Sequence, residues 1–240
     1  MVKLNRDKDK IQGIRSMFDR IARRYDMLNH LLSGYTDFIW RKYAVKKLNV
    51  FSGDWVLDVA IGTGDLSAAV LKGNKNPKSI VGVYISEKMM QIGRKKMVNY
   101  SNPSVQFVGA EAEFLPFRPA TFDRVMVAFG VRNFADVTAG LNGILHVLKP
   151  GGRLVVLELS YPRHKLFKYF YRFYSTFLVP LIGGWISGDR SAYRYLQVSV
   201  VDFPSRERLS AIMNSVGFVA TGWCDLSLGV ATVYWGEKKL

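Results

Sequence analysis

The 240-residue sequence has one cysteine and three histidines. A lone cysteine, Cys224, excludes an intramolecular disulfide, and a reducing interior is the default compartment for such a chain. We expect Cys224 to be a small buried residue of a late strand rather than a nucleophile. His30, His146 and His164 are scattered without the close spacing of metal-binding motifs, so the sequence predicts no metal site.

Long apolar runs are also missing. The longest run, residues 177–186, is interrupted by Pro180 and two glycines and is far too short to span a bilayer. The first ten residues are charged and contain no apolar core, so we expect no secretory signal and a cytoplasmic protein.

Acidic residues are scarce, with 19 Asp and Glu against 34 Lys and Arg, which gives a formal net charge of +15. Such an excess favours an anionic partner, whether a nucleic acid, an anionic membrane surface or an acidic substrate. It does not choose among them, since many of these charges fit ordinary solvated helix faces. No charge run alternates with aromatics in a recognised RNA-binding pattern, so no nucleic-acid partner is expected.

Short apolar runs alternate with helical patterns through the first two thirds of the chain. Hydrophobic residues make up 49% of it, which is enough for a core. The alternation is typical of βαβ units, so we predict an α/β fold with a mainly parallel sheet and helices on both faces. The expected strands are 55–60, 80–85, 105–108, 124–128 and 154–159, and the expected helices are 66–71, 87–97 and 135–147. A turn at residues 149–152 (KPGG) should end the last of these helices before a new strand begins.

The pattern changes after Ser160. Residues 163–185 mix Phe, Tyr and Leu with Arg and Lys, which predicts a helical insertion near 163–200 that lies outside the sheet. A further helix should begin near Ser205 and end at Val216, before Gly217. Two final strands, near 220–226 and 230–235, would complete the sheet. With no repeat and no low-complexity linker, one domain spanning residues 1–240 is the simplest organisation.

The most informative stretch is residues 55–66, an apolar strand that carries Asp58 and leads into Gly62-Thr63-Gly64 and Asp65. Glycine lacks a Cβ, so a backbone here can pass close to a bound nucleoside. A dinucleotide fingerprint would continue as G-x-G-x-x-G, whereas the third position is Ser67. The two acidic residues disfavour a pyrophosphate and favour a cationic ligand with hydroxyls, such as S-adenosylmethionine. Glycines that serve only the packing of a strand-turn-helix are the alternative.

Other motifs accompany this loop in a fixed order: FDRIARRYDMLN (18–29), DVAIGTGD (58–65), LPF (115–117), AFGVRNF (128–134), LKPGGR (148–153) and SAYRYL (191–196). Together they resemble the class I S-adenosylmethionine-dependent methyltransferases, and within them the ubiquinone/menaquinone-biosynthesis C-methyltransferase (UbiE-like) family. The resemblance runs from about residue 15 to the C-terminus. The RNF and YRYL segments are its most specific parts.

The resemblance implies a Rossmann-like sheet of seven strands, the last antiparallel, with the cofactor S-adenosylmethionine at the carboxyl ends of the early strands. It also implies that an N-terminal helical segment, residues 1–50, folds over the cofactor as a lid. The spacing of Phe18, Ile21, Tyr25 and Leu28 is explained equally well by an amphipathic helix that docks on the sheet.

The family's cofactor contacts carry over to eleven positions with one departure. At the end of the second strand, where the family has an acid that accepts from both ribose hydroxyls, this sequence has Tyr84. A phenol cannot accept bidentately, and hydrogen bonds to charged groups contribute about 1.5 to 3 kcal/mol. We therefore expect weaker cofactor binding unless Ser86 or Glu87 substitutes, and a chain that no longer binds the cofactor productively is the alternative. The implied contacts are Asp58, Ala60, Gly62, Thr63, Gly64, Tyr84, Ile85, Glu111, Ala112, Ala128 and Tyr25, with Glu111 placed to accept from the adenine amino group.

The implied reaction is methylation of a carbon of a prenylated quinol, demethylmenaquinol to menaquinol. Arg132 and Asn133 are the implied catalytic residues, with Arg132 stabilising a phenolate or orienting a water. A structural Arg132, paired with an acid such as Asp136, is the alternative. Substrate-pocket candidates of second rank are Tyr193, Tyr195 and Asp189.

The sequence of the helical insertion is compatible with more than one partner. Aromatics mixed with Lys and Arg over residues 165–185 suit an interfacial helix at a membrane. Packing against the chain's own domain or against the second subunit of a homodimer explains the same pattern equally well.

Two other functions compete with the quinol methyltransferase. One is a methyltransferase-like binding protein, suggested by Tyr84, and the other is an RNA methyltransferase, suggested by the charge alone.

Overall fold

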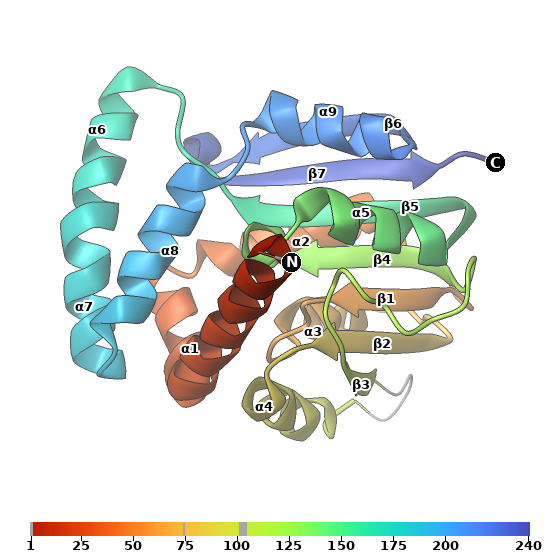
Figure 1. Cartoon of the computed structure of the whole chain (residues 1–240), viewed down its shortest axis with the longest axis horizontal. Helices are drawn as coiled ribbons and strands as arrows, with labels where there is room; N and C mark the ends of the chain where they lie inside the picture. Colours follow the sequence, from red (N-terminus) through yellow and green to blue (C-terminus); the bar gives the residue numbers. More distant parts are fainter. Residues whose placement is uncertain (1, 74, 101–104) are drawn as a thin grey trace.

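The computed structural model describes residues 2–73, 75–100 and 105–240, and it contains a seven-stranded sheet with the order β3-β2-β1-β4-β5-β7-β6 (Figure 1). Strand β7 is antiparallel to both of its neighbours, and the pairs that join β1 to β5 are parallel. The predicted Rossmann-like sheet with an antiparallel last strand is therefore confirmed. The strands are β1 (Trp55–Val59), β2 (Ser79–Tyr84), β3 (Val105–Gly109), β4 (Phe122–Ala128), β5 (Leu148–Leu159), β6 (Phe218–Leu226) and β7 (Ala231–Lys238).

The helices begin and end at residues whose chemistry explains their bounds. Ser86 caps α4 by accepting from the N–H of Met89, and Ser205 caps α9 in the same way. Gly217, at φ 117°, ends α9 in the left-handed conformation that suits glycine. Helices α4 and α9 match their predicted bounds. The helices are α1 (Val2–Leu32), α2 (Thr36–Leu48), α3 (Asp65–Lys72), α4 (Glu87–Met97), α5 (Val137–Val147), α6 (Lys165–Phe173), α7 (Val179–Ser187), α8 (Arg190–Asp202) and α9 (Arg206–Val216), with a π-helical turn, Tyr174–Leu178, between α6 and α7.

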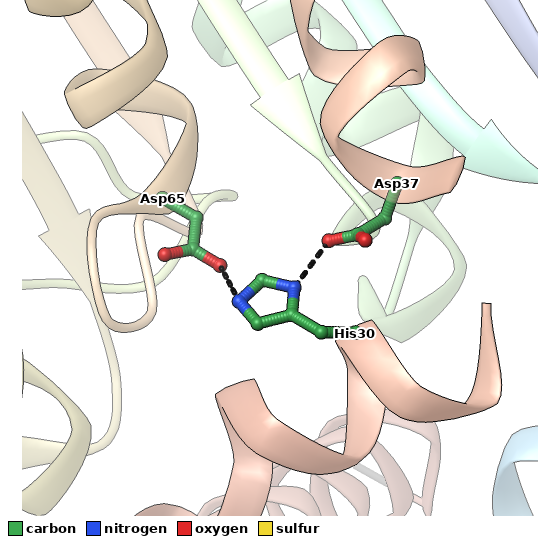
Figure 2. A group of neighbouring side chains, drawn as sticks. All are labelled: His30, Asp37 and Asp65. Atoms are coloured by element: carbon green, nitrogen blue, oxygen red, sulfur yellow. Dashed lines mark hydrogen bonds and ion pairs between the residues drawn. The ribbon is translucent and has the colours of Figure 1, made fainter. Parts of the chain in front are cut away.

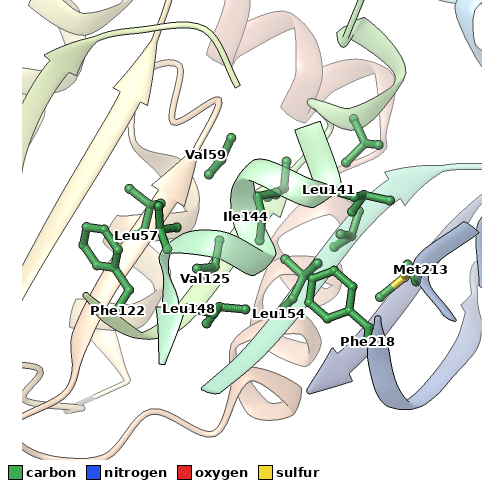
Figure 3. Packing of buried hydrophobic residues seen from close by; sticks show 14 of the residues in the cluster. Leu57, Val59, Phe122, Val125, Leu141, Ile144, Leu148, Leu154, Met213 and Phe218 are labelled. Carbon is green, nitrogen blue, oxygen red and sulfur yellow. The ribbon is translucent and has the colours of Figure 1, made fainter. Parts of the chain in front are cut away.

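Both faces of the sheet are covered by helices, as predicted. Successive strand residues point to opposite faces, so Leu57 and Val59 pack with α5 and α9 while Val56 packs with α2 and α3. Figure 3 shows the first of these cores, in which Ile144 of α5 lies among strand side chains. Cys224 lies on the late strand β6 as expected but is only partly buried.

Residues 149–152 (KPGG) do not form the predicted turn before the strand. Helix α5 ends at Val147, and β5 already begins at Leu148, which pairs with Phe122. The register then shifts before Arg153 pairs with Arg124, so residues 149–152 form an irregularity within β5 rather than a corner before it. Proline biases the residue before it toward extended backbone, which continues a strand instead of starting a turn.

Helix α1 and the inserted helices α6 to α8 gather at the carboxyl ends of the parallel strands, on the left in Figure 1. The apolar side of α1, which includes Phe18, Ile21 and Leu28, packs against Met89 of α4 and Tyr193 of α8. The helical character of both segments is thus confirmed, while their assignment to a single domain with a lid stays a prediction. Within the described ranges, no helix combines the length and apolar character needed to cross a membrane.

Replacing Ile144 by Ala should lower the free energy of unfolding by about 2 to 5 kcal/mol, because the fully buried side chain would leave a cavity. Chemical denaturation followed by circular dichroism measures this. Ile39→Ala is the matched control, since Ile39 also lies on a helix but is 67% exposed. Equal losses in the two variants would contradict the assignment of the core.

Candidate functional site

The ends of β1 and β4 meet where the strand order reverses, which is where open α/β sheets bind ligands. Ala60, directly after β1, has φ 59°, and Phe129, directly after β4, has φ 55°. Residues other than glycine rarely adopt this backbone conformation, and strained residues of this kind are often found at functional sites. Gly130 is required beside them, because a Cβ there would lie 2.5 Å from the Cβ of Ala60.

A first cavity opens at these strand ends. All but one of the predicted cofactor residues line it, and Asn133 lines it as well. The exception is Gly64, which is the N-cap residue of α3 and has φ 84°. The lining residues that were predicted are Tyr25, Asp58, Ala60, Gly62, Thr63, Tyr84, Ile85, Glu111, Ala112 and Ala128. Its free volume is about 70 Å³, so side chains or helix α1, which covers it, must shift to admit a nucleoside-sized ligand.

Asp58 is buried at the carboxyl end of β1. Its carboxyl accepts a hydrogen bond from the Ser67 hydroxyl at 2.7 Å. Burial raises the pKa of Asp58 to about 7, because a charge is costly away from water. A bound cation would favour the ionised form, so this carboxyl suits a positively charged ligand.

Tyr84 occupies the end of β2 and contacts helix α1. Its ring lies edge-on to Phe18 of α1, with the centroids 5.9 Å apart. Burial raises the pKa of Tyr84 well above its ordinary value, so the phenol stays protonated. The two suggested substitutes are engaged elsewhere: Ser86 donates to Asp19 at 2.5 Å, and Glu87 pairs with Arg94 at 2.5 Å. Neither lines the first cavity.

The glycine loop is connected to helix α1 by a hydrogen bond and by a lysine that bridges two aspartates. The Thr63 hydroxyl donates to Asp26 of α1 at 2.5 Å, and the Lys96 ammonium lies 2.7 Å from Asp26 and 2.5 Å from Asp65. Burial opposes ionisation of Asp65, but Arg41 and Lys96 outweigh it and hold its pKa below the usual range. Asp65, one of the two acids expected to favour a cationic ligand, lines the first cavity but is already paired with Arg41 and Lys96.

Figure 2 shows a cluster that sequence spacing did not predict. Nδ1 of His30 lies 2.7 Å from Asp37, and Nε2 lies 3.9 Å from Asp65, so three elements meet at one imidazole. The ligand atoms lie within 4.8 Å of one another, as in a metal site. However, Arg41 pairs with both aspartates, and its positive charge opposes a second cation. We interpret the cluster as an ion-pair connection between α1, α2 and α3.

A second cavity adjoins the first and is much larger, with a free volume of about 620 Å³. The two cavities share Phe18, Tyr25 and Phe129, so these aromatic side chains form the wall between them. Other lining residues are mainly apolar and come from α1, α2 and the inserted helices, among them Met17, Ile21, Trp40, Tyr171 and Val179.

Arg132 lines the second cavity, and its side chain is only 5% exposed. Its Nη1 pairs with Glu158 of β5 and donates to the Phe129 carbonyl at 2.7 Å. The paired acid is therefore Glu158 and not the suggested Asp136, which caps α5 by accepting from Thr138 and Ala139. Burial opposes the charge on Arg132, but Glu158 outweighs it and keeps the pKa above the ordinary value.

The Nε of Arg132 is buried and has no hydrogen-bond partner among the described residues. Glu158 itself is fully buried and also accepts from the backbone N–H of Arg132 and Leu159, at 3.2 and 3.0 Å. The acid thus fixes the guanidinium, while the donor capacity of Nε is unused within the described residues.

The other predicted residues divide between the cavities and the surface. Asn133 lines the first cavity and accepts from the Tyr195 hydroxyl at 3.0 Å, while Tyr193 and Tyr195 line the second. Asp189 lies outside both cavities: it caps α8 and pairs with Arg20 at 2.8 Å. Its placement in the substrate pocket is therefore corrected, because a carboxylate directly before a helix satisfies the helix N–H groups.

Sequence reasoning missed three residues of this site. Glu158 had a signal, since it is the one charged residue in the apolar run LVVLEL, and a buried charge needs a partner. Phe129 had only its place inside a motif. Arg41 had none, because it stands in a helix that is rich in Lys and Arg.

The chain is similar to known methyltransferases. A C-methyltransferase of ubiquinone and menaquinone biosynthesis (UbiE) from Geotalea daltonii is 44% identical over 99% of this chain and 100% of its own length. The demethylmenaquinone methyltransferase of Porphyromonas gingivalis is 41% identical over 95% and 94%. A solved SAM-dependent methyltransferase of Thermotoga maritima matches with a TM-score of 0.65 over 94% and 99% at 20% identity, which supports the fold. The model of the ubiE/COQ5 methyltransferase family matches residues 2–238, and the chain belongs to that family.

Proposed function

We propose that this methyltransferase transfers the methyl group of S-adenosylmethionine to a ring carbon of a prenylated quinol and converts demethylmenaquinol to menaquinol. The observation that carries the proposal is the pair of cavities that share the wall of Phe18, Tyr25 and Phe129. The names of the relatives from Geotalea and Porphyromonas support the quinone as acceptor.

The residues of the first cavity fit the cofactor. Bound there, S-adenosylmethionine supplies an electrophilic methyl group. Asp58 provides a carboxylate for its cationic end, and Glu111 an acceptor for the adenine amino group. Tyr84 provides a single neutral hydrogen-bonding group where a carboxylate would accept two.

The chain's own task is to position and polarise the acceptor. Methyl transfer requires a nucleophile about 3 to 3.5 Å from the methyl carbon, in line with the breaking bond. A quinol carbon becomes nucleophilic as its neighbouring hydroxyl loses a proton, so a cation near that oxygen stabilises the developing charge. Nε of Arg132 is a buried donor beside the second cavity, and Glu158 holds it in place. The apolar lining excludes water and accepts the prenyl chain.

We propose further that α6 and α7 rest on an anionic membrane surface, from which the quinol enters. Phe173, Phe177 and Trp185 are 55%, 62% and 86% exposed. Lys168 and Arg172 are exposed on the same segment. A helix with aromatics and cations of this kind binds at the interface of a bilayer.

Arg132→Lys should lower kcat by about 10² to 10³, because lysine keeps a charge for Glu158 but lacks the planar fork that leaves Nε free. The assay is methylation of a short-chain demethylmenaquinol with labelled S-adenosylmethionine. Affinity for the cofactor should stay unchanged in calorimetry, since Arg132 does not line the first cavity. Arg163→Lys, at an exposed pair with Glu207, is the control. Wild-type turnover in Arg132→Lys would contradict this role.

Cofactor affinity should rise about tenfold between pH 6 and pH 8. Asp58 has a pKa of about 7, so it is mostly protonated at pH 6 and mostly ionised at pH 8, and only the carboxylate attracts the cationic ligand. Calorimetric titration with S-adenosylmethionine at the two values measures the change. In Asp58→Asn the affinity should be lower and independent of pH over this range. An unaltered pH profile in that variant would assign the dependence to another group.

The triple variant Phe173→Ser, Phe177→Ser and Trp185→Ser should lose binding to vesicles that contain phosphatidylglycerol, because it removes the apolar contact. Co-sedimentation measures the bound fraction, and Phe114→Ser, at a 76% exposed position elsewhere, should bind as the wild type does. Sedimentation velocity of the same variants reports the oligomeric state. If the triple variant dissociates a dimer and still binds vesicles, the face is a subunit contact and the membrane proposal is wrong.

A further inference from the structure

We propose that Arg41 of α2 binds the carboxylate at the amino-acid end of the methyl donor, a role that rests on the proposed use of S-adenosylmethionine. Arg41 lines the first cavity, and only 5% of the residue is exposed. It is the single Arg or Lys among the described residues that line this cavity. The ligand's only carboxylate therefore has one cationic side chain to meet.

The hydrogen bonding of Arg41 is incomplete. Nη1 pairs with Asp37, and Nη2 lies 3.2 Å from Asp65. Nε is buried and has no hydrogen-bond partner among the described residues. A buried donor without an acceptor destabilises the folded protein, and a ligand oxygen would relieve that loss.

The position of Arg41 along the sheet matches one end of the ligand. The guanidinium lies 5.5 Å from the ring centre of Phe129, after β4, and pairs with Asp65, the first residue after the glycine loop of β1. Tyr84 and Glu111 follow β2 and β3, on the other side of β1 in the strand order. A ligand whose nucleoside lies against Tyr84 and Glu111 therefore extends its amino-acid end toward Arg41.

The charges near Arg41 also match. The amino-acid end is a zwitterion, with an ammonium and a carboxylate on the same carbon. Asp58 lines the cavity on β1 and attracts the ammonium, while Arg41 attracts the carboxylate. Asp37 and Asp65 keep the guanidinium in place, as acids commonly do for a buried arginine.

A purely structural Arg41, which only joins α2 to α3, is the competing explanation. The two explanations predict different affinities for a ligand that lacks the carboxylate. Calorimetry is therefore done with S-adenosylmethionine and with its decarboxylated analogue, on the wild type, Arg41→Gln and Arg41→Lys. Arg124→Gln is the control, since Arg124 is partly buried and paired with Asp54 but lies outside the cavity.

We expect the wild type and Arg124→Gln to bind the decarboxylated analogue at least tenfold more weakly than S-adenosylmethionine, as for a lost charge-assisted hydrogen bond. In Arg41→Gln this ratio should fall to about one, because only the affinity for the intact ligand decreases. Arg41→Lys keeps the positive charge that Asp37 and Asp65 require, so it should fold and give an intermediate ratio. This variant tests the proposal if Arg41→Gln does not fold.

Three results would overturn the assignment. An unchanged ratio of the two affinities in the Arg41 variants, whether both ligands bind more weakly or neither does, would leave Arg41 a structural role alone. A wild type without preference for the carboxylate would also refute it, while leaving the proposed function intact. Failure of the wild type to bind S-adenosylmethionine at all would overturn the proposed function as well. Quinol methylation is not measured, so an error about the acceptor does not affect the outcome.

Discussion

The left-handed backbone at Phe129 is the constraint on which both cavities depend. A bulky residue at φ 55° is strained, and three contacts keep it there. Its N–H donates to the Leu157 carbonyl at 2.7 Å, and its own carbonyl accepts from Arg132 and from Asn133. The bend turns the ring of Phe129 into the wall between the cavities and sends Arg132 and Asn133 to opposite sides of it. One strained residue thus contributes to the wall between the two cavities and places a side chain at each of them.

Two buried arginines follow the same principle on the two sides of this wall. Arg132 is held by Glu158, and Arg41 by Asp37 and Asp65. A buried guanidinium needs such partners, because its desolvation is otherwise too costly. The acids occupy both terminal nitrogens of Arg41 but only Nη1 of Arg132, and in each case Nε has no partner among the described residues. The acids therefore hold each guanidinium in place, and the proposals above assign the remaining donor to a ligand.

Local chemistry was enough to predict much of this structure. Apolar periodicity located the strands, and Ser205 and Gly217 marked the ends of α9 that the structure confirms. Pairings between distant segments were out of reach, because nothing near Glu158 in the sequence indicates Arg132, and nothing near His30 indicates Asp65. Such contacts depend on the order of the strands and on the direction in which helix α1 crosses them, which no local pattern encodes.

Tyr84 bears on which groups of the proposed site contribute to cofactor affinity. The phenol stays protonated and packs against Phe18 of helix α1, so under the proposed function the end of β2 offers the ribose less than a carboxylate would. The same contact then links ribose recognition to the position of α1, and the hydrogen bond from Thr63 to Asp26 links the glycine loop to α1 as well. On that proposal, the affinity lost at the ribose has to come from the contacts of α1 and from the charged end of the ligand. A family member with this substitution is expected to depend more on its N-terminal helix and on its charged groups than one that keeps the acid.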